Sequence, residues 1–147
     1  MAKFSTGLRN GMLTNVGFLE ALNGGVLKIF SAQGVPASAD AAETGVLLMT
    51  LTAGGDGTTG LTFDPPVAGV LSKSPSQVWM TPSVDTAGTC AYFRFVAKND
   101  DGTASDTAPR VQGTVGAIGA DMNLTNTTVT AGTPWTLNYF NVGLPSM

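Results

Sequence analysis

The sequence predicts an all-β fold: a jelly-roll-like β-sandwich of about eight or nine short strands, preceded by a short helical segment. Three observations lead to this prediction. Short apolar or alternating runs recur along most of the chain, as strands do. Clusters of glycine, proline, asparagine and aspartate separate these runs, as turns do. Only the beginning of the chain carries apolar residues at helical spacing.

Length and composition indicate one packed domain. The chain has 147 residues, of which 43% are hydrophobic, and this leaves no room for a second core. We divide it into an N-terminal helical arm or segment, residues 1–25, and a β-sandwich domain, residues 26–147. Charged residues make up only 12%, about half the usual share. A surface with so little charge is expected to be partly covered in the working state.

The N-terminal segment is predicted to form two short helical pieces. Ser5 or Thr6 can cap a helix whose apolar residues lie three or four positions apart: Leu8, Met12, Val16 and Leu19. Gly11 and Gly17 each weaken that helix by up to about 1 kcal/mol. We therefore expect a break near Thr14, with Asn15 capping a second short turn.

The rest of the chain carries strand patterning. We expect strands at residues 26–30, 46–52, 61–63, 67–71, 77–81, 89–97, 110–115, 122–124, 127–130 and 135–142. Residues 46–52 are apolar on both faces, which is typical of a central strand. Residues 89–97 alternate most clearly. Residues 99–102, with the sequence N-D-D-G, are predicted to form a hairpin turn.

Several residues that could carry chemistry lack the partners they need. The chain has no histidine, which excludes Ser-His-Asp and Cys-His catalysis and histidine-ligated zinc. Cys90 lies within a predicted strand with no activating base, so we expect a small buried core residue. No calcium-loop motif is present, and the aspartates are expected to be solvated turn residues: Asp56, Asp85, Asp100, Asp101, Asp106 and Asp121. We predict no enzyme, no cofactor and no metal site.

Two further motifs have both a structural and a functional interpretation. Residues 55–60 match G-x-G-x-x-G, yet a strand and two prolines follow where a dinucleotide site needs a helix, so a hairpin loop is expected. Four aromatic residues could form a sugar-binding platform: Trp79, Tyr92, Trp135 and Tyr139. Their positions within strands also suit a sandwich core, and the core interpretation is favoured.

Charge and hydropathy argue against two classes of partner, nucleic acids and membranes. The seven lysines and arginines are scattered singly in a chain of net charge −3, which disfavours nucleic-acid binding. No stretch approaches the roughly 20 apolar residues of a membrane span. Residues 1–25 lack the apolar core of a secretory signal, and a lone cysteine is typical of a reducing compartment. We therefore expect synthesis in a cytosol.

Four segments of the chain resemble a known family. They are S-T-G-L-R-N at 5–10, G-G-V-L-K-I-F at 24–30, P-A-S-A-D-A-A at 36–42 and A-G-V-L-S at 68–72. These segments resemble small proteins encoded among the structural genes of tailed bacteriophages. The chain looks most like the capsid cement, or decoration, proteins of short-tailed phages, which are jelly rolls that pair across symmetry axes outside the shell.

The resemblance implies a structural virion protein, made in the host bacterial cytoplasm, that binds the exterior of an icosahedral capsid and bridges its capsomers. The implied partners are the major capsid protein and a second copy of the chain, as a homodimer. Alternatives are a tail or head-tail component, or a carbohydrate-binding β-sandwich module. From the weak helix we expect a docking arm around Phe4, Leu8 and Arg9. The other possibility is that this segment packs on its own sandwich.

Overall fold

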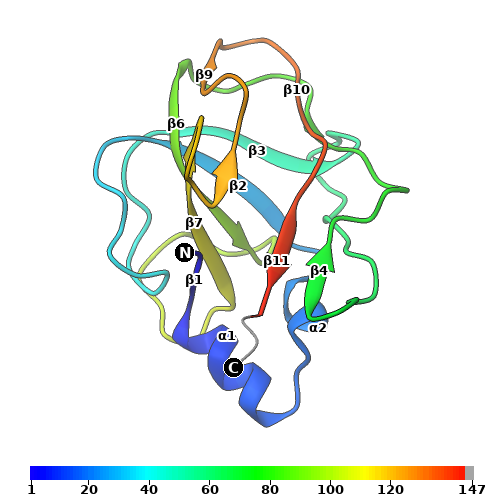
Figure 1. The fold of residues 1–147 in the computed structure, drawn as a ribbon. Helices are drawn as coiled ribbons and strands as arrows, with labels where there is room; N and C mark the ends of the chain where they lie inside the picture. Colours follow the sequence, from blue (N-terminus) through cyan, green and yellow to red (C-terminus); the bar gives the residue numbers. More distant parts are fainter. Residues whose placement is uncertain (145–147) are drawn as a thin grey trace.

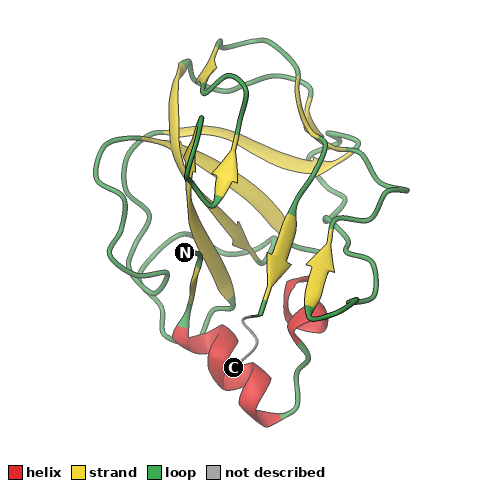
Figure 2. Cartoon of the chain, in the orientation of Figure 1, coloured by secondary structure: helices red, strands yellow, loops and turns green. Residues whose placement is uncertain are grey.

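The computed structural model describes residues 1–144, which form two short helices and eleven strands (Figures 1 and 2). The helices are α1 (Thr6–Thr14) and α2 (Phe18–Leu22). The strands are β1 (Lys3–Phe4), β2 (Val26–Ser31), β3 (Leu47–Ala53), β4 (Val70–Ser72), β5 (Trp79–Thr81), β6 (Gly88–Val96), β7 (Arg110–Gly116), β8 (Met122–Asn123), β9 (Thr128–Val129), β10 (Trp135–Leu137) and β11 (Asn141–Gly143).

Nine of these strands form one large sheet in the order β1-β7-β6-β2-β3-β5-β10, with β8 beside β7 and β9 beside β6. All pairs in it are antiparallel except β7 with β8. β4 and β11 form a small second sheet, which Figure 1 shows on one side of the large one. The prediction of an all-β, sandwich-like fold is confirmed. The extra strands are β1, which was not predicted, and the second of two strands found within the predicted strand at 135–142. The predicted strand at 61–63 was wrong, because these residues form only isolated bridges, Leu61 with Gly25 and Phe63 with Lys73.

The core lies between the two sheets, and β2, β3 and β6 supply eight of its 22 buried apolar residues, the others coming from the two helices, other strands and loops. Aromatic rings fill its centre: Trp79 is fully buried and packs edge-on against Phe63, with ring centroids 5.2 Å apart. Phe95 and Phe140 complete the cluster at 5.8 and 5.5 Å from Trp79. Trp79 is thus a core residue, as the strand pattern favoured.

The predicted strand at 135–142 is two strands. β10 pairs with β5 in the large sheet, and β11 pairs with β4 in the small one (Figure 1). The alternation shifts between them: Leu137 and Phe140 are both buried although three positions separate them, and Tyr139 is 85% exposed. The chain therefore leaves one sheet and enters the other at residues 138–140.

Residues 1–25 pack on the domain in this structure. β1 joins the edge of the large sheet, with Lys3 opposite Gln112, and Ser5 caps α1 by accepting a hydrogen bond from the Leu8 N–H. The break between the two helices is confirmed. The second helix, however, is preceded by Gly17, and Asn15 instead ends the first.

A loop that we call the strap, residues 32–46, is joined to the large sheet by polar side chains. Four successive strap carbonyls, at 36–39, each accept a hydrogen bond from a sheet side chain; the donors are, in that order, Gln112, Lys3, Arg94 and Arg110. Lys28, Arg94 and Gln112 lie opposite one another on β2, β6 and β7, so these side chains form one row across the sheet. The strap thus covers one face of the sheet and buries the side chains of Arg94 and Arg110, which would otherwise be exposed to solvent.

Candidate functional site

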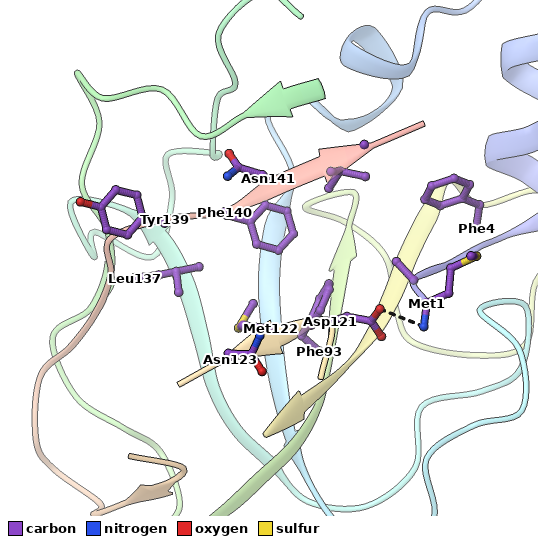
Figure 3. A pocket seen from close by; sticks show the side chains of 13 residues that line it. Met1, Phe4, Phe93, Asp121, Met122, Asn123, Leu137, Tyr139, Phe140 and Asn141 are labelled. Carbon is purple, nitrogen blue, oxygen red and sulfur yellow. Dashed lines mark ion pairs between the residues drawn. The ribbon is translucent and has the colours of Figure 1, made fainter. Parts of the chain in front are cut away.

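An apolar groove of about 680 Å³ opens where β1 and β8 face the strand segment 137–143 (Figure 3). Its lining is mainly apolar and includes Phe4, Phe93, Met122, Phe140 and Val142. Asp121 stands at its edge, where a carboxylate oxygen lies 3.0 Å from the amino group of Met1. The groove has the lining of a site for an apolar ligand or side chain.

A second hollow, of about 410 Å³, lies beside the apolar groove. We call it the asparagine hollow, because Asn123, Asn126 and Asn138 line it, together with Trp135 and Tyr139 among others. The two hollows share Asn123, Leu137 and Tyr139, so they are neighbours on one face. No charged residue lines the asparagine hollow.

A third feature is a projecting loop that we call the apolar tip, residues 65–70, with the sequence P-P-V-A-G-V. All of its residues are exposed, and Val67 is 75% exposed. The backbone of Val67 and Val70 is joined by two hydrogen bonds, of 3.0 and 2.9 Å, around a tight turn. Ala68 (φ 50°) and Gly69 (φ 77°) both adopt the left-handed conformation that such a turn requires.

The apolar tip was not recognised from the sequence as a feature of its own. Residues 67–71 were predicted as a strand, and the strand begins only at Val70. The sequence carries a partial signal: Pro65 and Pro66 rule out a strand interior at these two positions, and Gly69 interrupts the apolar run that follows.

Buried ion pairs replace the solvated turn predicted at 99–102. The connection from β6 to β7 runs over residues 97–109, and the Asp100 side chain, 2% exposed, accepts hydrogen bonds of 2.6 and 2.7 Å from Arg110. Burial raises the pKa of Asp100, but the bonds from Arg110 and from the Gly102 N–H outweigh it and hold the pKa below its ordinary value. The prediction that Asp100 is solvated was wrong.

The strap also provides partners for two other cationic side chains, Lys28 and Arg94. Lys28 pairs with Glu43 at 2.9 Å, and both side chains are largely buried. Arg94 is fully buried, donates to Gln112 and to the Ser38 carbonyl, and leaves its Nη1 without a hydrogen-bond partner among the described residues. Burial lowers the pKa of Arg94. Four of the seven cationic side chains therefore donate to the strap or to the loop that follows β6: Lys3, Lys28, Arg94 and Arg110.

The three residues predicted for a docking arm lie in different environments. Phe4 is half-buried, lines the apolar groove and packs edge-on against Phe18 at 5.4 Å. Leu8 is fully buried in the domain's own core, so a partner could reach it only if the segment detached. Arg9 is exposed, and its Nη2 donates to the Thr6 hydroxyl at 2.9 Å.

The remaining candidates have structural roles. Cys90 is buried as predicted, and this burial raises the pKa of its thiol to about 11, far from the reactive range. Residues 55–60 form a loop in which the Asp56 carboxylate accepts hydrogen bonds from Thr58 and Thr59, and no helix follows. Asp121, predicted to be solvated, accepts hydrogen bonds from Thr114.

Within residues 1–144, no three side chains of the metal-ligating types gather in one place. Neither of the two described helices has the length and apolar character needed to cross a membrane. No protein-family model, curated protein or solved structure matches the chain.

Proposed function

We propose that this chain is a structural virion protein, a capsid cement protein that binds the outside of an icosahedral bacteriophage shell and bridges its capsomers. The observation that carries the proposal is the apolar tip. Its six exposed residues bear no charged or polar side chain. Exposed apolar patches of this kind usually mark an interaction site. The four segments that resemble cement proteins support the same function, and one of them, residues 68–72, includes half of the tip.

The tip is suited to docking because it is already ordered. Proline fixes φ at residues 65 and 66, and the turn at Ala68 and Gly69 is closed by the Val67–Val70 hydrogen bonds. A preorganised surface loses little conformational entropy on binding, so a modest contact can be useful. Standard interfaces bury about 800 Å² per partner, and contacts repeated between two capsomers add through effective concentration.

Bridging also supplies the mechanism of stabilisation. A protein that binds the assembled shell and not the free capsid protein shifts the equilibrium toward the shell by mass action. The second copy that completes a homodimer would provide the second contact. No bond is made or broken in this function, which agrees with the absence of histidine from the sequence.

Protein mass spectrometry of purified virions tests the proposal. The phage used is the one whose genome encodes this chain, and the copy number is measured relative to the major capsid protein. We expect a copy number close to that of the capsid protein. A few copies per particle would indicate a tail or head-tail component instead, and absence from the particle would refute a virion role.

A matched pair of variants tests the contact itself. Shells that lack this protein are titrated with Val67→Ser, which changes the tip, and with Ile118→Ser, which changes an equally apolar residue that is 93% exposed elsewhere. Removing one buried valine is expected to weaken binding about tenfold. Equal binding by the two variants would show that the tip is not the docking surface.

A further inference from the structure

We propose that the asparagine hollow is a binding site for a neutral oligosaccharide, separate from the apolar tip. The hollow has a volume of about 410 Å³ and is lined by residues 123–126 and 135–139. Its side chains are amides, hydroxyls, aromatic rings and leucines. The site would serve recognition of a glycan whether or not the chain is a virion component.

The aromatic residues supply the platform. Tyr139 is 85% exposed. The next residue, Phe140, is buried in the core and so holds the backbone of Tyr139 in place. Figure 3 shows its ring extending away from Phe140. Trp135 is half-buried and packs against the core, which holds it in place while part of its surface remains open. Aromatic rings bind the apolar C–H faces of sugar rings while leaving the hydroxyl groups free for hydrogen bonds.

The asparagines supply oriented donors. The Asn123 side-chain oxygen accepts a hydrogen bond from the Ala120 N–H at 3.1 Å, and that of Asn126 accepts one from the Thr128 N–H at 3.0 Å. An amide whose oxygen is occupied presents its NH₂ group, with two donors, to whatever lies beside it. Such fixed donors match sugar hydroxyl and ring oxygens.

The lack of charge defines the ligand class. No lysine or arginine lines the hollow, so a phosphorylated, sulfated or acidic sugar would find no counter-ion there. No carboxylate lines it either, which removes the usual partner of an amino sugar with a free ammonium group. An uncharged hexose chain is the ligand that these side chains complement.

Tryptophan fluorescence tests the proposal directly. The chain has two tryptophans, and Trp79 is fully buried, so a ligand in the hollow changes mainly the emission of Trp135. The intact chain is titrated with maltohexaose, cellohexaose and chitohexaose, each to about 10 mM, because the small contact area of such ligands sets a weak affinity. Saturable quenching by at least one of the three is expected.

Two variants make the test specific. Tyr139→Ala is expected to weaken binding of that oligosaccharide about tenfold, since it removes a stacking ring. Ile118→Ala, an exposed apolar residue outside the hollow, is expected to leave binding unchanged. Chemical-shift changes at the side-chain amides of Asn123 and Asn126 are expected in the same titration.

Three results would overturn the proposal. They are no saturable quenching by any of the three probes, equal weakening by both variants, or quenching by a short neutral peptide, Gly-Leu-Leu-Gly, in place of the sugars. The last result would assign the hollow to a protein partner. None of these outcomes depends on whether the chain is found in virions, so the capsid proposal and this one can fail separately.

Discussion

The strap, residues 32–46, and the apolar tip, residues 65–70, are both loops, but they are fixed in opposite ways. The strap is fixed from outside: side chains of the large sheet donate to its carbonyls at 36–39. The tip is fixed chiefly from within, by its prolines and its left-handed turn, and only Gly69 and Val70, at its end, bond to β11 and the residue after it. In a loop of the first kind, backbone carbonyls are hydrogen-bonded to side chains of the domain and are not available to a partner. A loop of the second kind leaves much of its side-chain surface exposed to a partner, as Val67 at 75% exposure shows.

The difference also predicts how each loop responds to mutation. Beneath the strap, buried charges depend on one another, so removing one leaves another unpaired in a low-dielectric environment. The tip makes few contacts with the rest of the domain, so its substitutions should change binding and leave the fold nearly intact. The following predictions test this contrast, from the largest expected effect to the smallest.

Arg110→Met should destabilise the domain most, by about 3–5 kcal/mol, because it leaves the buried Asp100 carboxylate without its cation. Guanidinium unfolding measures the loss. Arg94→Met is the matched control: it removes an equally buried arginine that has no carboxylate partner, and should lose only about 1 kcal/mol. Equal losses would mean that burial of the side chain, and not the ion pair, sets the effect.

The pH dependence of stability should report the same ion pair. The pKa of Asp100 is lower in the folded state than its ordinary value of about 3.9. Its stabilisation is therefore complete above that ordinary value and is lost as pH falls through the lower, folded-state value. Urea unfolding between about pH 5 and pH 2 should show Asp100→Asn to be less stable at pH 5 and less sensitive to acid. Parallel curves for the two proteins would contradict this.

Asp40→Ala should destabilise the domain by about 1 kcal/mol, as loss of a helix cap does. Asp40 lies in the strap, and its carboxylate accepts hydrogen bonds from the Thr6 N–H at 2.6 Å and the Thr6 hydroxyl at 2.7 Å, at the start of α1. Thermal unfolding measures the change. Asp106→Ala, at an exposed loop position, should change stability by less than about 0.5 kcal/mol.

Ala68→Gly should raise stability by up to about 1 kcal/mol, because glycine adopts the left-handed conformation without strain. Ala37→Gly, in the strap, should lower stability by about 0.5–1 kcal/mol, since Ala37 has no positive φ and glycine only adds freedom to the unfolded chain. Denaturant unfolding of both variants measures the two signs. If both substitutions changed the free energy of unfolding in the same direction, the predicted difference in backbone conformation between the two loops would be contradicted.

Most of the large sheet could be predicted because its strands carry their own pattern. Residues 26–31, 47–53, 88–96 and 110–116 alternate or are continuously apolar, and each forms a strand within a residue or two of its predicted bounds. β1 could not be predicted, since two residues carry no period and Lys3 depends on a partner more than a hundred positions away.

The burial of Asp100 and the break at Tyr139 show what local pattern lacks. Asp100 lies in an N-D-D-G sequence with ordinary turn chemistry, and only the fold brings Arg110 to it. Tyr139 and Phe140 are both aromatic, so the sequence pattern does not show which of the two rings is buried. Of the three residues predicted for a docking arm, Phe4 alone lines a groove, whereas Trp135 and Tyr139, two of the four aromatic residues considered for sugar binding, do line the asparagine hollow. The hollows could not be predicted, because they form between segments distant in sequence.

The pairing of β1 with β7 has a consequence for the time course of synthesis. Lys3 is synthesised more than a hundred residues before its partner Gln112. At about 5–20 residues per second, the first strand waits on the order of 5–20 seconds for its place in the sheet. Until then Leu8 cannot reach the core that finally covers it. The segment that contains β1 and α1 is therefore among the last parts to reach its final position, and a nascent chain that does not yet include β7 cannot complete this fold.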